Sequence, residues 1–261
     1  MSFIEAIILG IIQGLTEFLP VSSSGHLEIG KALLGTDVEG SLSFTVVVHG
    51  ATVLSTIVVF YREIIKIIRE SLQFKYNSST SYLIKITISM VPVLVVGLLW
   101  KDEVESLFSG NLTFVGSMLI ITSVLLGLTF FIKKDGTKKI PYLDALIMGI
   151  AQALAVLPGI SRSGATISAG VLLGNNREET ARFSFLMVLL PIIGANLIDL
   201  LDRPVNAGES LSAGILIAGF FAAFISGLLA CKLMLNIVKR GKLIYFAAYC
   251  LIIGILTIIF A

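Results

Sequence analysis

Long apolar runs constrain this chain more than any other feature. Six of them have nearly the length that crosses a lipid bilayer, at Phe44–Tyr61, Tyr82–Trp100, Leu112–Ile132, Thr180–Leu200, Leu211–Leu233 and Leu243–Phe260. An α-helix crosses with about 20 apolar residues and satisfies its backbone hydrogen bonds internally. Only 14% of the residues are charged, compared with about 25% in soluble domains. We therefore expect an all-α integral membrane protein with six transmembrane helices, folded as one membrane domain over residues 1–261.

Two further apolar stretches are interrupted by helix-breaking residues. Phe3–Leu19 ends before Pro20 and is followed by the short segment Gly25–Leu34. Leu143–Leu157 ends at a Pro-Gly pair and is followed by Gly164–Leu173. Proline and glycine end helices, and non-helical backbone at membrane depth must be buried in protein or line a wet cavity. Each stretch is therefore expected to form a re-entrant helix-loop-helix pair.

The two halves of the chain repeat. A shift of 139 residues places Gly10 on Gly149 and Gln13 on Gln152. The same shift matches polar residues and glycines at the two breaks, pairing Ser22 with Ser161, Ser24 with Ser163 and Gly25 with Gly164. These matches predict an internal duplication, with repeat 1 over about 3–132 and repeat 2 over about 143–261.

Loop charges predict how the chain sits in the membrane. Basic residues gather in three loops, at Arg62, Lys66, Arg69, Lys75 and Lys85, at Lys133, Lys134, Lys138 and Lys139, and at Lys239, Arg240 and Lys242. Basic loops are cytoplasmic by the positive-inside rule, which places both termini outside. Three spans then separate the equivalent points of the repeats, so the repeats have inverted topology. The first re-entrant pair is expected to enter from the outer face and the second from the inner face.

Inverted repeats with broken helices place a binding site near the membrane midplane, where helix N-termini can hold an anion. New helices are expected to start at about Ser24 and Ser163, whose free backbone N–H groups favour a phosphate. We expect the two breaks to meet and form one phosphate-binding site. The net charge of +2 falls in short loops and gives no indication of a nucleic-acid partner.

Two charged residues at the breaks are candidates for the chemistry. Glu17 lies four residues after Gln13, so both project from one helix face. An ionisable residue at membrane depth indicates function, and this carboxylate is expected to bind a hard divalent cation that bridges substrate phosphates. Arg162 is expected to bind phosphate oxygens through its guanidinium group. The alternatives are a hydrated carboxylate and a snorkelling arginine, both at the membrane interface.

Histidines and hydroxyls complete the candidate set. His26 follows Ser-Ser-Ser-Gly at a helix start, so it is expected to transfer a proton. His49, the other histidine, lies within a span and is interpreted as a packing residue that tolerates alanine with little loss of turnover. The hydroxyls are expected to cap a helix, to bind phosphate or to do both, with a serine nucleophile as a further alternative at the first break. They belong to Ser22, Ser23, Ser24, Ser161, Ser163 and Thr166.

These motifs resemble those of the undecaprenyl pyrophosphate phosphatase family of the bacitracin-resistance type. Gln13-x-x-x-Glu17 matches the family's (Glu/Gln)-x-x-x-Glu signature and is followed by Pro20-Val21-Ser22-Ser23-Ser24-Gly25-His26. The second break, Pro158-Gly159-Ile160-Ser161-Arg162-Ser163-Gly164-Ala165-Thr166, matches its Pro-Gly-x-Ser-Arg-Ser-x-x-Thr signature. The resemblance covers essentially the whole chain.

The resemblance implies a multi-pass enzyme of the plasma membrane that removes the terminal phosphate of a polyprenyl diphosphate and returns the monophosphate as a lipid carrier for cell-wall synthesis. It also implies dependence on Mg²⁺ or Ca²⁺ and an active site open toward the outer face. Glu17 and Gln13 would handle the cation or a water, and Glu17 alone would supply charge. His26 would be the acid or base, and the nucleophile is Ser23, His26 or a water. The diphosphate would be held by Arg162, Ser161, Ser163 and Thr166, with Gln13, Ser22 and Ser24 as further binding residues.

Three other functions compete with this one. A polyprenyl-phosphate transporter or flippase would also use inverted repeats and broken helices, but it has little need for Glu17, Ser23, His26 and Arg162 together. The other type of membrane lipid phosphatase needs a further histidine and aspartate that are absent downstream of Arg162. A non-catalytic scaffold leaves a midplane arginine unexplained. The expected partners are the polyprenyl diphosphate and membrane lipids, with a homodimer as an open alternative to a monomer.

Overall fold

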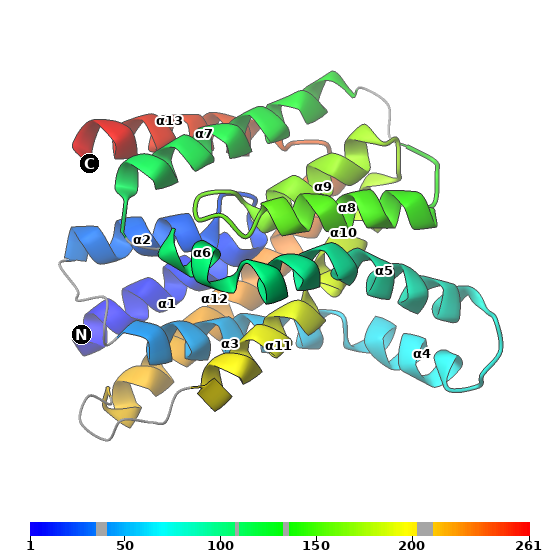
Figure 1. The fold of residues 1–261 in the computed structure, drawn as a ribbon, viewed down its shortest axis with the longest axis horizontal. Helices are drawn as coiled ribbons and strands as arrows, with labels where there is room; N and C mark the ends of the chain where they lie inside the picture. Colours follow the sequence, from blue (N-terminus) through cyan, green and yellow to red (C-terminus); the bar gives the residue numbers. More distant parts are fainter. Residues whose placement is uncertain (35–40, 108–109, 133–135, 203–210) are drawn as a thin grey trace.

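The computed structural model describes residues 1–34, 41–107, 110–132, 136–202 and 211–261. Within these ranges the regular elements are helices, and a single isolated bridge joins Lys138 to Asn175. Most of the helices run roughly along the long axis of the molecule, and the two termini lie at the same end (Figure 1). The expected all-α fold is confirmed.

The helices of the first half are α1 (Phe3–Phe18), α2 (Ser23–Leu34), α3 (Ser41–Val59), α4 (Tyr61–Ser71), α5 (Ser78–Leu99), α6 (Lys101–Ser106) and α7 (Leu112–Leu128), which continues into the 3₁₀ turn η1 (Thr129–Phe131). Those of the second half are α8 (Tyr142–Leu154), α9 (Arg162–Leu172), α10 (Arg177–Met187), α11 (Leu189–Asp202), α12 (Ala213–Lys239) and α13 (Ile244–Phe260). Every predicted span and half-helix therefore coincides with observed helix.

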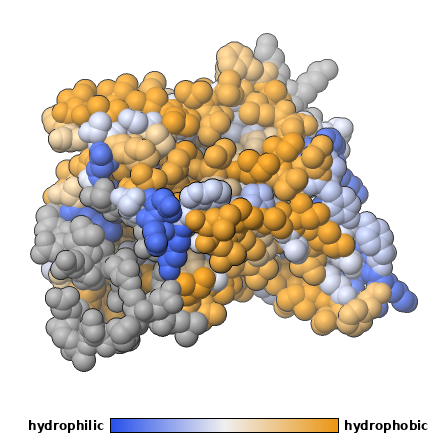
Figure 2. All heavy atoms as spheres, viewed as in Figure 1, coloured by the Kyte–Doolittle hydropathy of each residue, from blue (hydrophilic) through white to orange (hydrophobic). Residues whose placement is uncertain are grey.

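Four stretches of the described chain are long and apolar enough to cross a membrane: α5, α7 with η1, α10 with the first part of α11, and α12. A fifth is α3, if it and α4 count as one span bent by 74°. Helix α13 matches the last predicted span but has 17 residues. The surface is largely hydrophobic, with hydrophilic residues gathered around α6 and at the end of the molecule that carries α4 (Figure 2). These features are those of a helical integral membrane protein.

The helices that flank the two breaks are short. Helices α2, α8 and α9 have 12, 13 and 11 residues, or roughly 17 to 20 Å at about 1.5 Å per residue. A bilayer core is about 30 Å thick, so none of them crosses it alone. This is the length expected of half-helices.

Each broken helix packs on a span from the other half of the chain. Helix α1 lies along α12, and α8 lies along α5. A Cβ atom at Gly10 would come within 2.6 Å of the Gly219 carbonyl oxygen, and one at Gly149 would collide with the backbone of Ser89. Gly10 and Gly149 are matched by the shift of 139 residues. Small residues allow membrane helices to approach this closely, so the repeat fixes where the two breaks are held.

Candidate active site

The first break is built by a proline and a capping serine. Helix α1 ends with Leu19 in extended conformation, and Pro20, which has no N–H group, cannot continue it. Ser22 takes a positive φ of 70°, a conformation that redirects the chain. Its Oγ accepts a hydrogen bond from the Gly25 N–H at 3.2 Å, which satisfies one free donor at the start of α2.

The second break repeats this arrangement. Ser161 is the N-cap of α9, and its Oγ accepts a hydrogen bond from the Gly164 N–H at 3.0 Å. The buried loop before it is satisfied by Thr122 of α7, whose hydroxyl donates to the Gly159 carbonyl at 3.0 Å and accepts from the Ser161 N–H at 2.9 Å. Thr122 was not among the predicted residues, because only the fold brings it to the loop.

The two breaks touch, as their shared chemistry predicted. Ser163 Oγ donates to the Leu19 carbonyl at 3.4 Å, which joins the second break to the end of α1. Within each break the same pair of hydroxyls lies 3.3 Å apart, Ser22 with Ser24 and Ser161 with Ser163. The capping contacts and the hydroxyl pairs thus recur at positions 139 residues apart, as the proposed duplication requires.

Glu17 is the centre of the site. Its side chain is 8% exposed, and its Oε1 accepts a hydrogen bond from Arg162 Nη2 at 2.8 Å. Its Oε2 accepts from Ser23 Oγ at 2.6 Å and from Gln13 Nε2 at 2.9 Å. Four predicted site residues from α1, α2 and α9 therefore meet at one carboxylate. Each oxygen of the carboxylate has a partner, as burial of a charge requires.

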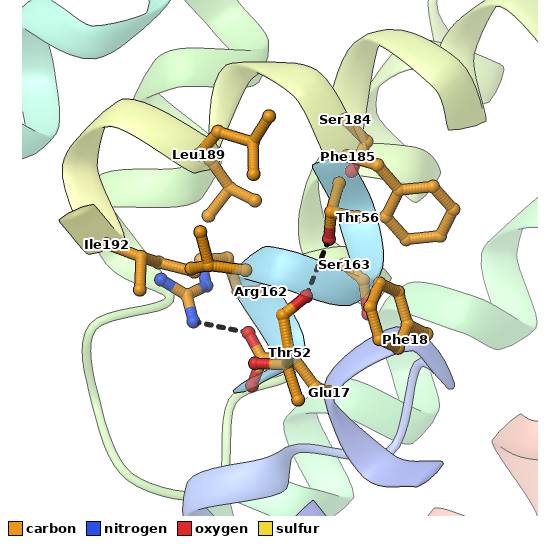
Figure 3. A pocket seen from close by; sticks show the side chains of 12 residues that line it. Glu17, Phe18, Thr52, Thr56, Arg162, Ser163, Ser184, Phe185, Leu189 and Ile192 are labelled. Atoms are coloured by element: carbon orange, nitrogen blue, oxygen red, sulfur yellow. Dashed lines mark hydrogen bonds and ion pairs between the residues drawn. The ribbon is translucent and has the colours of Figure 1, made fainter. Parts of the chain in front are cut away.

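A cavity of about 390 Å³ opens beside this carboxylate. Glu17, Arg162 and Ser163 form part of its polar wall, together with Thr52 and Thr56 of α3 (Figure 3). The rest is mainly apolar and comes from Phe18, Val53, Phe185, Val188, Leu189 and Ile192. Figure 3 shows the Arg162 guanidinium directed at Glu17, with Leu189 and Ile192 nearby. A charged group and a hydrocarbon chain can thus be bound side by side.

The remaining predicted hydroxyls make contacts within the scaffold. Thr166 Oγ1 donates to the Arg162 carbonyl at 2.9 Å and lies 2.6 Å from Ser184 Oγ of α10. Ser161 is 1% exposed and serves as the cap of α9. These residues hold Arg162 at the first turn of its helix. Their predicted contact with phosphate stays a prediction.

His26 turns toward α13. Its Nδ1 lies 2.9 Å from the Ser22 carbonyl, and its Nε2 lies 2.8 Å from the Tyr249 hydroxyl. The two rings are stacked with centroids 5.6 Å apart. A carbonyl can only accept, so Nδ1 carries the proton and the Tyr249 hydroxyl donates to Nε2. Both ring nitrogens are therefore engaged, and the predicted role of His26 in proton transfer requires exchange of the tyrosine contact.

The interpretation of His49 as a packing residue needs correction. Its Nε2 lies 3.9 Å from Glu17 Oε2, the oxygen that Ser23 contacts. The gap is longer than a hydrogen bond and has the size that one water molecule bridges. His49 lies on α3 one turn before Thr52, which lines the cavity. Polar residues at spacings of three and four along this span were the signal that could have identified the face.

We expect His49→Ala to lower kcat about tenfold, because a hydrogen bond to a charged group contributes about 1.5 kcal/mol or more. His49→Gln keeps an N–H donor near the position of Nε2 and should stay within about threefold of the natural protein. His49→Asn is the matched control, with the same amide on a shorter side chain, and should behave like alanine. Steady-state phosphate release with melting temperatures measures this. Full activity of His49→Ala would return the residue to a packing role.

The residues around Glu17 fit a hard divalent cation in their donor chemistry. Carboxylate, amide and hydroxyl oxygens are available from Glu17, Gln13 and Ser23, and Gln13 Oε1 is buried without a hydrogen-bond partner. Among the described residues no group of three or more His, Cys, Asp or Glu side chains could hold a metal ion. Mg²⁺ is often bound by one or two carboxylates, with waters and substrate phosphates as its other ligands.

Comparison with known proteins agrees with this site. The model of the family described as "Bacitracin resistance protein BacA" matches residues 6–256. A protein of Bacteroides fragilis named undecaprenyl-diphosphatase is 54% identical over 99% of this chain and 98% of its own length. Proteins with the same name from Parabacteroides distasonis and Methanosphaera stadtmanae are 53% and 39% identical, each over 99% of this chain and 98% of their own.

Proposed function

Since this chain belongs to the family of bacitracin resistance protein BacA, we propose that it is a membrane enzyme that hydrolyses undecaprenyl diphosphate to the monophosphate and inorganic phosphate. The reaction returns a lipid carrier to cell-wall synthesis. The substrate is the diphosphate of a long polyprenyl chain.

One observation carries this proposal: Ser23, Glu17 and Arg162 form a connected set where two broken helices meet. Ser23 Oγ donates to one oxygen of the Glu17 carboxylate at 2.6 Å, and Arg162 donates to the other at 2.8 Å. A hydroxyl bonded to a carboxylate is an activated nucleophile. A guanidinium beside it can bind a phosphate with two hydrogen bonds. Phosphoryl transfer asks mainly for such positioning and neutralisation of charge.

Ser23 is the nucleophile in the reaction that we propose. Its Oγ attacks the terminal phosphorus, its proton passes to Glu17 Oε2, and the bond from that phosphorus to the bridging oxygen breaks. The polyprenyl monophosphate leaves with the electron pair on its own phosphate oxygen. A water then bonds to the phosphorus of the phosphoserine. Ser23 Oγ leaves with the proton held by Glu17, and inorganic phosphate is released with the water's oxygen.

Arg162, the helix starts and a cation share the negative charge in this proposal. Arg162 leaves Glu17 Oε1 for the phosphate oxygens, and the first N–H groups of α2 and α9 favour the same anion. A Mg²⁺ or Ca²⁺ ion, held by Glu17 and Gln13, would neutralise further charge on the diphosphate when bound. The apolar wall of the cavity, which includes Leu189 and Ile192, would contact the start of the isoprenoid chain.

We also propose the finer topology: six transmembrane helices, two re-entrant pairs and inverted repeats, with the site open to the outer face of the plasma membrane. The basic helix α4 lies at the end of the molecule opposite the two termini (Figure 1). By the positive-inside rule the α4 end is cytoplasmic and both termini are outside. The α1·α12 and α8·α5 pairs exchange equivalent elements between the repeats, which supports an inverted duplication.

The test is phosphate release from undecaprenyl or farnesyl diphosphate by the detergent-purified protein. We expect release that EDTA stops, and that added Mg²⁺ or Ca²⁺ restores to at least half the initial rate. Zn²⁺ at equal concentration serves as a control, because a site built from oxygen donors favours Mg²⁺ and Ca²⁺.

Two other results would change the proposal. Release that EDTA leaves unchanged would remove the cation from it. No release under any condition, from protein with a cooperative melting transition, would favour a polyprenyl-phosphate transporter that uses the same broken helices as a binding site.

A further inference from the structure

Helix α4 carries two adjacent rows of exposed side chains that have no part in the active site. The apolar row consists of Tyr61, Ile65, Ile68 and Leu72, the last just beyond the helix end, which are 47%, 58%, 54% and 65% exposed. The basic row consists of Arg62, Lys66 and Arg69, all exposed. Spacings of three and four residues place the members of each row on one side of the helix. The two rows therefore run side by side along its outward surface.

The position of α4 sets how these rows face a membrane. The helix turns away from α3 by 74° at Phe60. A helix that leaves a span at such an angle runs close to the plane of the membrane. Its other face is fixed to the protein, because Ile64 and Ile67 pack against the core and Glu63 forms an ion pair with Arg182. The outward rows are therefore held at a fixed position.

The charges of the basic row are not neutralised within the described part of the chain. Arg62 donates to the Tyr61 hydroxyl at 2.8 Å, and none of Arg62, Lys66 and Arg69 forms an ion pair there. Glu63 is committed to Arg182, and Glu70 accepts a hydrogen bond from Ser79 at 2.5 Å. The hollow between the rows is lined by both basic and apolar side chains. It matches an anion that is attached to a hydrocarbon chain.

We propose that α4 is an interfacial helix that binds the phosphate headgroups of anionic phospholipids. The apolar row enters the acyl region, and the basic row contacts the headgroups above it. Amphipathic helices of this composition lie in the interface plane, and each basic residue near an anionic surface adds to the attraction. The occupant is the lipid surface of the protein's own membrane. This binding depends on the membrane setting of the chain and not on its catalytic reaction.

Lipid selectivity tests the basic row. Full-length protein in detergent is mixed with equal amounts of phosphatidylglycerol and phosphatidylcholine, and bound lipids are counted by native mass spectrometry. We expect a preference for phosphatidylglycerol of about fivefold or more, falling to about twofold or less in R62Q/K66Q/R69Q. The matched control R62K/R69K keeps the charges and should keep the preference. Both variants should release phosphate at rates within about twofold of the natural protein, which separates lipid binding from catalysis.

Depth in the bilayer tests the apolar row independently. Cys231 and Cys250 are buried, so a bimane label can be placed at Ile68→Cys or, as the control, at Lys66→Cys. In nanodiscs, lipids brominated in the acyl chain should quench the label at position 68 at least about twice as strongly as that at position 66. Equal quenching at the two positions, or an unchanged lipid preference in R62Q/K66Q/R69Q, would overturn the proposal. Quenching at neither position would leave α4 as a surface for a soluble protein.

Discussion

Replacing Arg162 with alanine is expected to lower turnover by about 10³-fold or more, the range of effects known for arginines that stabilise a transferring phosphoryl group. The guanidinium lies 2.8 Å from Glu17 at the meeting of the two halves of the chain, and it is the cationic side chain of the described cavity lining. Arg162→Lys keeps the charge but loses the planar pair of donors, so it should recover only a small part of the activity. Initial rates of phosphate release measure both variants.

Arg182 provides the matched control. It is also an ion-paired arginine, bonded to Glu63 and Glu178, but it lies away from the cavity lining. Arg182→Ala should lower the melting temperature and leave kcat within about threefold of the natural value, because exposed ion pairs contribute to stability and not to this reaction. Arg162→Ala protein that folds normally and retains a tenth of the activity would remove Arg162 from the centre of the reaction.

Much of the fold follows from local sequence. The spans are long apolar runs, and the two breaks follow from Pro20 and from the Pro-Gly pair after Leu157, so both could be located without a structure. The short helices began within about one residue of the expected positions. The bend between α3 and α4 was not predicted, because an amphipathic segment that follows a span gives no angle. The pairing of α1 with α12 and of α8 with α5 also depends on packing between distant segments.

The composition of the site was more predictable than its wiring. Glu17, Ser23 and Arg162 were all identified from their motifs, because ionisable groups are rare at membrane depth. Their bonding to one another was not, since Glu17 and Arg162 are 145 residues apart. His49 was assigned to packing because a lone histidine in an apolar run carries no motif. Its 3.9 Å approach to Glu17 exists only through the docking of α3 beside α1.

Replacing Glu17 with glutamine is the second change with a large expected effect. The amide has nearly the same size and can still accept a hydrogen bond from Ser23, but it cannot take the proton of the Ser23 hydroxyl. General bases contribute about 10² to 10⁴ in rate, so kcat should fall by at least about 10²-fold. The KM should not rise, because removal of a carboxylate frees Arg162 and reduces repulsion of the anionic diphosphate. A lower kcat at constant or lower KM separates this role from loss of binding.

Glu28→Gln is the control that makes this result specific. Glu28 is a second buried carboxylate on α2, 8% exposed and paired with Lys31 at 3.2 Å, and it makes no printed contact with Ser23 or Arg162. Its substitution removes a charge of equal burial from the same helix pair, so any general loss of stability should appear there too. We expect Glu28→Gln to keep kcat within about threefold while Glu17→Gln loses about 10²-fold. Equal losses in both variants would mean that Glu17 acts through the fold and not through proton transfer.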